Sequence, residues 1–386
     1  MRTRLLSTTL TTTALLVLHC GGSIDSGDAD ALDLVASAAP ATTLGEKDDS
    51  VIPPLALATG GAHTCAVQNG GVKCWGNNRF GQLGLGPLLL PLPTGCIDPN
   101  DPYQGIYCRL PLQVKGLTSG VKQIANADYT SCALLSNGTV KCWGSSKFGQ
   151  VGIGTGIPAG CRRDEEYSYI IRCDEPVTVV NLSGATDLTA GLDHFCARVS
   201  TGAVKCWGNN QISQMGIGWS RPAECERQMS DGRALMCRTP VQVQGLSGAT
   251  AVRSFGDFSC ATYTAGGVTG GLKCWGGAGG LGAYGVGKTV PAGCVDGEGD
   301  KIPDMCTTAT AVTGLSGVTK FSVGGSHACA VVGGGGLKCW GSHINGELGI
   351  GNSVPAATCF DLYNRGRADG CFLPTAVPGL SGVTAV

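Results

Sequence analysis

The tetrapeptide Lys-Cys-Trp-Gly occurs five times in this chain, and its spacing constrains the fold more than any other feature. Its tryptophans stand 68, 64, 68 and 65 residues apart, at Trp75, Trp143, Trp207, Trp275 and Trp340. A long, nearly constant period is typical of a repeat architecture, in which one small unit is stacked several times. We therefore predict one body of five units rather than the two or three ordinary domains that 386 residues suggest. The units cover approximately 55–117, 118–182, 183–246, 247–315 and 316–386.

Short strands joined by tight turns are the structure that each unit predicts. An alternating run at 57–67 suits a half-buried strand, and Asn-Gly at 137–138 supplies the positive φ that hairpin turns need. After the tryptophan, glycine alternates with apolar or polar residues, as at 148–154, which indicates a bend where backbones approach closely. With 63 glycines and only 14% charged residues, the composition favours strands and turns over helices, and we predict an all-β fold.

The first unit shows the repeat in full. It reads Gly-Gly-x-His-x-Cys-Ala-Val from Gly60 and Gly-Val-Lys-Cys-Trp-Gly-Asn-Asn-Arg-Phe-Gly-Gln-Leu-Gly-Leu-Gly from Gly71. This pattern resembles the regulator of chromosome condensation (RCC1) repeat, and the resemblance runs through all five copies, from about residue 55 to residue 386. It implies a β-propeller whose blades are small antiparallel sheets. Rings of that family usually hold seven blades, whereas five copies are recognised here; rings of about four to eight blades are physically reasonable.

The last residues bear on how such a ring would close. The segment 374–386 repeats the stretch that precedes the inner cysteine pair in each unit, and the first unit lacks most of that stretch. This favours a last blade built from both ends of the chain, which would hide two exposed sheet edges. The alternative is a truncated array of blades.

An export signal is predicted at residues 1–20. Arg2 and Arg4 form a basic start, and the apolar, Thr-rich stretch at 5–18 is too short to span a bilayer. We therefore expect the chain to leave the cytoplasm of a bacterium.

The end of that signal resembles a bacterial lipoprotein lipobox, in which Cys20 would become the lipid-modified first residue. His19 stands where a small residue is usual, so both a lipoprotein of the outer membrane and a secreted protein remain open. Residues 21–50 are rich in Gly, Ser, Ala and Asp without an apolar period, which predicts a disordered tether. The propeller would then occupy 51–386.

Apart from Cys20, the chain has twenty cysteines, four in each unit, and an even number in an exported chain favours disulfides. The second pair of every unit is separated by 12 residues around variable contents, which favours a bridge within the loop. The first pair flanks a hairpin turn, so its members face each other across antiparallel strands. The predicted bridges are Cys65–Cys74, Cys96–Cys108, Cys132–Cys142, Cys161–Cys173, Cys196–Cys206, Cys225–Cys237, Cys260–Cys274, Cys294–Cys306, Cys329–Cys339 and Cys359–Cys371. Zinc is the alternative, but the chain has no Cys-x-x-Cys knuckle.

No metal, cofactor or nucleic acid is expected. Lys and Arg total 27 against 28 Asp and Glu, without a basic run that would bind a phosphate backbone. The acidic run at 296–300 resembles the start of a calcium loop but lacks its distal glutamate. His63, His194 and His327 precede the first cysteine of their units, where another unit has Phe258, so we expect a structural role for them.

The loops between the second pair of cysteines are the part that does not repeat. Variable polar and aromatic side chains on cross-linked loops suit a recognition surface, because pre-ordering lowers the entropy lost on binding. The candidate binding residues are Arg162, Arg163, Glu165, Tyr167, Tyr169, Tyr363 and Arg365. The alternative is that these loops are solvated decoration.

We therefore predict an exported, membrane-anchored, non-catalytic scaffold that binds a protein or another cell-surface macromolecule as a monomer. The membrane would be reached through the N-terminal lipid only. An enzyme with an axial site built from several blades is the alternative. Guanine nucleotide exchange and chromatin binding, which the resemblance implies, are opposed by the signal peptide, the disulfides and the neutral charge, and a fold indicates function only weakly.

Overall fold

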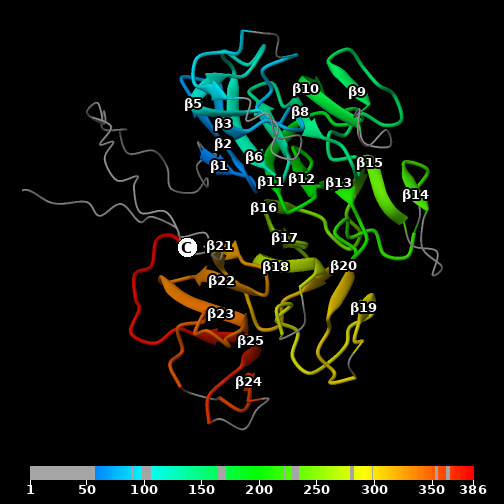
Figure 1. Cartoon of the computed structure of the whole chain (residues 1–386). Helices are drawn as coiled ribbons and strands as arrows, with labels where there is room; N and C mark the ends of the chain where they lie inside the picture. The colour runs from blue at the N-terminus through cyan, green and yellow to red at the C-terminus, as the bar shows by residue number, and fades with distance from the viewer. Residues whose placement is uncertain are drawn as a thin grey trace, which may run out of the picture. The chain divides into compact units, whose positions relative to one another are not determined.

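The computed structural model describes residues 57–87, 91–97, 106–163, 171–220, 222–227, 234–278, 282–297, 299–352, 355–361 and 366–386. These residues form 25 β-strands and no helix (Figure 1). The predicted all-β fold is confirmed. The predicted signal peptide, Cys20 and the tether lie outside the described residues. Within the described part, no helix is long and apolar enough to cross a membrane.

Five sheets of five strands follow one another along the chain. The first comprises β1 (Leu57–Thr59), β2 (His63–Gln68), β3 (Gly71–Asn77), β4 (Cys96–Ile97) and β5 (Tyr107–Gln113). The second comprises β6 (Val121–Asn126), β7 (Thr130–Leu135), β8 (Val140–Ser145), β9 (Cys161–Arg163) and β10 (Ile171–Thr178). The third comprises β11 (Ala185–Ala190), β12 (His194–Val199), β13 (Val204–Asn209), β14 (Cys225–Arg227) and β15 (Ala234–Gln242).

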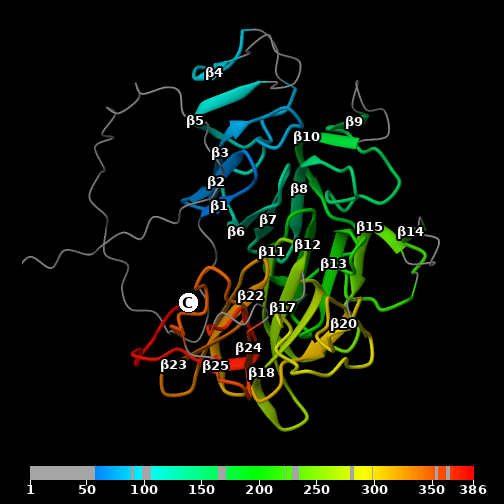
Figure 2. The same cartoon turned by 60° about the horizontal axis from the view of Figure 1, so that its bottom comes forward.

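The last two sheets repeat the plan. The fourth comprises β16 (Ala249–Phe255), β17 (Phe258–Ala265), β18 (Val268–Gly277), β19 (Cys294–Val295) and β20 (Met305–Ala311). The fifth comprises β21 (Val318–Val323), β22 (His327–Val332), β23 (Gly336–Ser342), β24 (Cys359–Phe360) and β25 (Gly370–Ala376). In each sheet the fifth strand lies between the third and the fourth, so the fourth is outermost, as β4, β9 and β14 show (Figure 2).

The second and third strands of each sheet form the predicted hairpin. In the second sheet the turn places Gly138 at φ 80°. The side chain of Asn137 also stabilises this turn, because its Oδ1 accepts a hydrogen bond from the Thr139 amide at 3.0 Å. In the fourth sheet the Gly-rich insertion lengthens both strands, and Gly266 and Gly267 make the turn at φ 60° and 80°. Cys260 still lies opposite Cys274.

Disulfides staple every blade twice, as the fold prediction requires. The first bridge of each sheet links the two hairpin strands, and the second links the outermost strand to its neighbour. The bridges are Cys65–Cys74, Cys96–Cys108, Cys132–Cys142, Cys161–Cys173, Cys196–Cys206, Cys225–Cys237, Cys260–Cys274, Cys294–Cys306, Cys329–Cys339 and Cys359–Cys371.

The repeated tryptophan joins each sheet to the one before it. Four of the five are fully buried, and their indole Nε1 atoms donate to backbone carbonyls of the preceding sheet's bend. These bonds are Trp143 to Gln82, Trp207 to Gln150, Trp275 to Gln214 and Trp340 to Ala283. The glycine run after the tryptophan is the seat for the next indole, because a Cβ on Gly84 would lie 2.8 Å from Trp143 Nε1. Trp75, in the first sheet, is only partly buried.

The prediction that the start of the first unit and the tail of the last unit share one blade is wrong for the described residues. The inner strand of the first sheet is β1, which comes from the first unit itself. After β25 the described residues 377–386 form no strand, and the Val383 amide donates to Gly335 O at 3.0 Å. Val121 makes the same bond to Gly70 at 2.8 Å as it enters β6. The tail therefore follows the path that leads, elsewhere in the chain, from one sheet into the next.

Candidate functional site

The sheets present two different ends. Val121 pairs with Leu135 and Asn126 with Ser131, so β6 starts beside the hairpin turn and ends beside the turn at 127–129. We call the first end the hairpin end and the second the loop end. Cys173 pairs with Gly144, which places the Cys161–Cys173 bridge toward the loop end. The loop end carries aspartates and exposed apolar side chains, whereas lysines and arginines line a cavity at the hairpin end.

At the loop end, the turns that join the first and second strands are bonded to one another. The Gly61 amide donates to Asp128 O at 3.1 Å, the Asp128 amide to Leu192 O at 2.9 Å, and the Leu192 amide to Gly256 O at 2.7 Å. These backbone bonds join the turns of the first four sheets, and we call residues 60–62, 127–129, 191–193 and 255–257 the turn ladder. Because backbone atoms make these bonds, the positions of the four turns do not depend on the side chains of the ladder.

Three turns of the ladder each carry a carboxylate. Gln150 Nε2 donates to Asp193 Oδ1 at 3.0 Å, and Gln214 Nε2 donates to Asp257 Oδ1 at 2.8 Å. Burial raises the pKa of Asp193 and the charge of Asp257 adds to this, whereas the hydrogen bond from Gln150 and the charge of Lys147 act to lower it. Burial also raises the pKa of Asp128, with a further contribution from Asp193. The like charges are therefore close enough to repel one another, and a cation placed over them would be stabilised.

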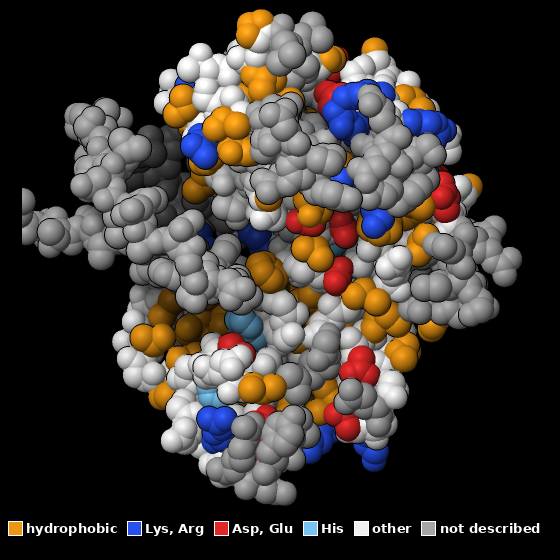
Figure 3. Space-filling view, in the orientation of Figure 1, with side chains coloured by type: hydrophobic (Ala, Val, Ile, Leu, Met, Phe, Trp, Pro, Cys, Tyr) orange, Lys and Arg blue, Asp and Glu red, His pale blue; other side chains and the backbone are white. Residues whose placement is uncertain are grey.

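Apolar side chains are exposed beside these carboxylates. The exposed fraction is 40% for Tyr129, 50% for Leu192 and 56% for Phe255, one from each of three neighbouring turns. Phe80 packs edge-on against Tyr129 with ring centroids 5.2 Å apart. Figure 3 shows that apolar and acidic side chains also neighbour one another on the face that it presents. Exposed aromatic and aliphatic groups among polar ones are typical of protein interaction sites.

The structure places only two of the predicted binding residues. Arg162 and Arg163 lie on the outermost strand β9, and Arg162 Nε donates to Asp174 Oδ2 at 2.9 Å. The other candidates lie outside the described residues, namely Glu165, Tyr167, Tyr169, Tyr363 and Arg365. The turn ladder was missed because its bonds join different units, although an aspartate recurs in three of the five turns.

Two of the histidines have the structural role expected of them. His63 Nε2 lies 2.8 Å from Ser131 Oγ, and His194 Nε2 lies 2.9 Å from Ser259 Oγ, in each case across to the next sheet. Burial lowers the pKa of His63 to about 4 and that of His194 to about 3. Both imidazoles are therefore neutral at pH 7.

The acidic run at 296–300 caps its own backbone. Asp296 accepts hydrogen bonds from the amides of Gly299 at 2.6 Å and Lys301 at 2.9 Å, and Asp300 accepts one from Ile302 at 2.8 Å. Glu298 lies outside the described residues. Across the described ranges, no group of three or more His, Cys, Asp or Glu side chains is arranged to hold a metal ion.

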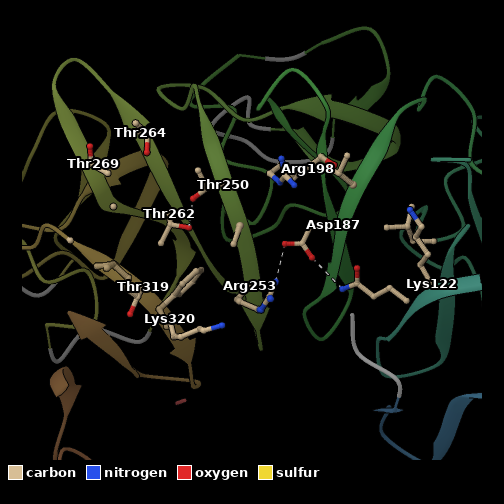
Figure 4. A pocket seen from close by; sticks show the side chains of 18 residues that line it. Lys122, Asp187, Arg198, Thr250, Arg253, Thr262, Thr264, Thr269, Thr319 and Lys320 are labelled. Carbon is tan, nitrogen blue, oxygen red and sulfur yellow. Dashed lines mark hydrogen bonds and ion pairs between the residues drawn. The ribbon is translucent and has the colours of Figure 1, made fainter. Parts of the chain in front are cut away.

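A cavity of about 670 Å³ opens at the hairpin end, lined by residues of the second to fifth sheets. Its charged lining residues are Lys122, Asp187, Arg198, Arg253 and Lys320 (Figure 4). The lining holds one carboxylate and no histidine. No linear motif contains these residues. The sequence indicates them only weakly: the first strands of three sheets carry a polar residue at the same position, namely Gln123, Asp187 and Lys320.

Protein-family models match parts of the repeated sequence of this chain. Models described as the regulator of chromosome condensation (RCC1) repeat match residues 69–134, 121–150 and 185–214. Protein pim1 of Schizosaccharomyces pombe is 27% identical over 336 residues, which cover 86% of this chain and 54% of pim1. The ultraviolet-B receptor UVR8 of Arabidopsis thaliana is 28% identical over 46% of this chain and 36% of its own length. The chain thus spans about half or less of these curated relatives.

Solved structures show the same fold. Human WBSCR16 aligns with a TM-score of 0.57 and 18% identity, covering 84% of this chain and 68% of its own. Yeast RCC1 (Prp20), in the structure that holds it bound to Kap60, aligns with a TM-score of 0.55 and 17% identity, covering 83% and 74%. The five sheets are therefore blades of an RCC1-type β-propeller.

Proposed function

This chain carries RCC1-type repeats, and on that premise we propose that it is a non-catalytic binding protein whose turn ladder contacts a protein partner. The observation that carries the proposal is the set of three backbone hydrogen bonds that join the four turns of the ladder, which carry the exposed side chains of Tyr129, Leu192 and Phe255. Rigid, exposed groups lose little entropy when a partner docks on them.

The chemistry of the ladder indicates the partner's side chains. Leu192, Phe255 and Tyr129 offer apolar contact area, and the neighbouring carboxylates favour a lysine or arginine of the partner. Asp193 is partly buried, so an ion pair made there would be screened less than one at the open surface. We expect a partner that presents a basic side chain flanked by apolar ones.

Protein binding by relatives of known structure supports protein binding as the class of function. Yeast RCC1 (Prp20) is described bound to Kap60, and a second structure of Prp20p is described with its binding properties to Gsp1p and histones. We do not carry those partners over to this chain. Its formal net charge of −1 and its disulfides favour a different partner in a different compartment.

The proposal includes export. The predicted signal at residues 1–20 and ten disulfides, which persist in oxidising compartments, support a place in the cell envelope or outside the cell. Lipidation of Cys20 would anchor the propeller to the membrane through the predicted tether at 21–50. The partner would then be a protein of the cell surface.

A photo-crosslinking amino acid at Leu192 tests the proposed surface. With the full chain in its native cells, illumination is expected to join a discrete protein to position 192. The matched control is position 110 on β5, where Leu110 is 51% exposed but lies away from the ladder. The same bands from both positions, or bands from position 110 alone, would contradict the proposal.

A further inference from the structure

We propose that the cavity at the hairpin end binds a small anion with two or more negative charges, either a polycarboxylate or a phosphate ester. This site lies at the opposite end of the sheets from the turn ladder and does not depend on the function proposed for the ladder. A volume of about 670 Å³ is in the range of small-molecule pockets.

The lining has more positive than negative groups. Lys122, Arg198, Arg253 and Lys320 line the cavity together with a single carboxylate, that of Asp187. Figure 4 shows Asp187 and Arg253 at the centre of the view, Arg198 above them, and Lys122 and Lys320 on opposite sides. Cations gathered in a concave site raise the local concentration of anions.

The carboxylate of Asp187 is already used by its own surroundings. Its Oδ2 accepts hydrogen bonds from Arg253 Nη1 at 2.9 Å and from the Val252 amide at 3.1 Å. Its Oδ1 accepts from Gln123 Nε2 at 3.3 Å and from the Leu188 amide at 3.1 Å. Asp187 therefore balances Arg253 and leaves the charge of Arg198 without a carboxylate among the lining residues.

Arg198 provides a second and independent observation. Its Nε atom is buried and has no hydrogen-bond partner among the described residues. A buried donor without an acceptor is destabilising, because it has lost its hydrogen bonds to water. An oxygen of a bound anion in the cavity would supply the missing acceptor. Lys122, which is exposed, lies where it would attract that anion from solution.

Hydroxyl groups complete the lining. Thr250 Oγ1 donates to Thr262 Oγ1 at 2.8 Å, so the proton of Thr262 is left to donate to a ligand. Thr264 and Thr269 lie on the hairpin of β17 and β18, which only the fourth unit lengthens. The cavity thus depends on an insertion that the other repeats lack.

Isothermal titration of the mature protein with citrate and with pyrophosphate, in low salt, tests the proposal. We expect saturable binding at one site, and the stronger of the two anions assigns the carboxylate or the phosphate class. Arg198→Met should weaken that binding at least tenfold, and Lys122→Met should weaken it less and reduce its dependence on salt. The control is Arg109→Met on β5, an exposed arginine outside the lining, with unchanged affinity.

Absence of saturable binding to both anions would overturn the proposal, as would equal affinities of the wild type and the Arg198→Met variant. Lys122 is exposed, so its substitution tests the site even if Arg198→Met does not fold. Because neither residue touches the turn ladder, failure here leaves the result of crosslinking at position 192 unaffected.

Discussion

The indole Nε1 of Trp143 donates a hydrogen bond of 2.9 Å to the backbone carbonyl of Gln82, which belongs to the preceding sheet. The same bond recurs at three further interfaces, so each of these four tryptophans holds two blades together rather than stabilising its own blade alone. This explains why the tetrapeptide is repeated and why it is a poor candidate for a binding site.

Replacing one of these tryptophans should therefore destabilise the protein according to its burial. Trp207→Ala removes a fully buried indole and its hydrogen bond, and we expect a loss of about 3–5 kcal/mol in the free energy of unfolding. Trp75→Ala, at the partly buried copy, should cost clearly less. Urea unfolding of both variants, with disulfides intact, checks this. Equal losses would show that the indole does not act between blades.

The glycine that seats the indole should not tolerate a side chain. Gly84 has φ 64°, and its Cβ would lie 2.8 Å from Trp143 Nε1. Gly116 has φ 70° but nothing within 4 Å of a Cβ, so Gly116→Ala measures the backbone strain alone, about 1–2 kcal/mol. We expect Gly84→Ala to lower the thermal midpoint considerably more than Gly116→Ala. Similar midpoints would argue against close packing at this seat.

Two neutral histidines should make stability fall in mild acid. The unfolded chain takes up protons near pH 6.5, whereas burial lowers the folded pKa of His63 to about 4 and of His194 to about 3. Stability is therefore full above pH 6.5 and falls by up to about 1.4 kcal/mol per histidine for each pH unit between 6.5 and 4.

The double variant His63→Asn, His194→Asn isolates this effect. It loses the bonds to Ser131 and Ser259 and should be less stable at pH 7.5, but its stability should change less between pH 7.5 and pH 5. The raised pKa values of Asp128 and Asp193 act in the opposite direction and are common to both proteins. An unchanged pH slope in the variant would assign the acid sensitivity to other groups.

The hairpin bridge of the fourth sheet closes the longest loop of its kind, with a sequence separation of 14, so its loss should be clearly destabilising. Replacing Cys260 and Cys274 by alanine removes the bridge that closes this loop and should cost about 2–4 kcal/mol in the free energy of unfolding. Because Thr264 and Thr269 lie beyond it on the same hairpin, citrate or pyrophosphate binding should weaken as well. Unchanged stability would mean that strand pairing alone holds the hairpin.

The repeat predicted much of the fold. A tryptophan, a glycine run and four cysteines recur at matched positions in the five units. The cysteines form the same two bridges in every unit, and four of the five tryptophans are buried in the same way. The shared blade was wrong because the residues of the tail, although similar in sequence to the start of an inner strand, have no partner strand among the described residues.

The candidate sites could not be predicted in the same way. Asp128 and Leu192 stand 64 positions apart, and only the backbone bond between their turns shows that they are neighbours. The lining of the anion cavity combines residues such as Lys122, Arg198 and Arg253, which come from different sheets and different strand positions. These residues are close because the sheets pack against one another, and the period of the repeat does not predict that packing.

The affinity of the crosslinked partner for variants of the ladder tests the account most directly. Leu192→Ser combined with Phe255→Ser removes the two most exposed of the three apolar side chains and leaves every backbone bond of the ladder in place. We predict that this variant binds the purified partner at least tenfold more weakly than the wild type, while Leu110→Ser binds it equally well. Equal affinity of all three proteins would contradict the claim that the loop end is the binding surface.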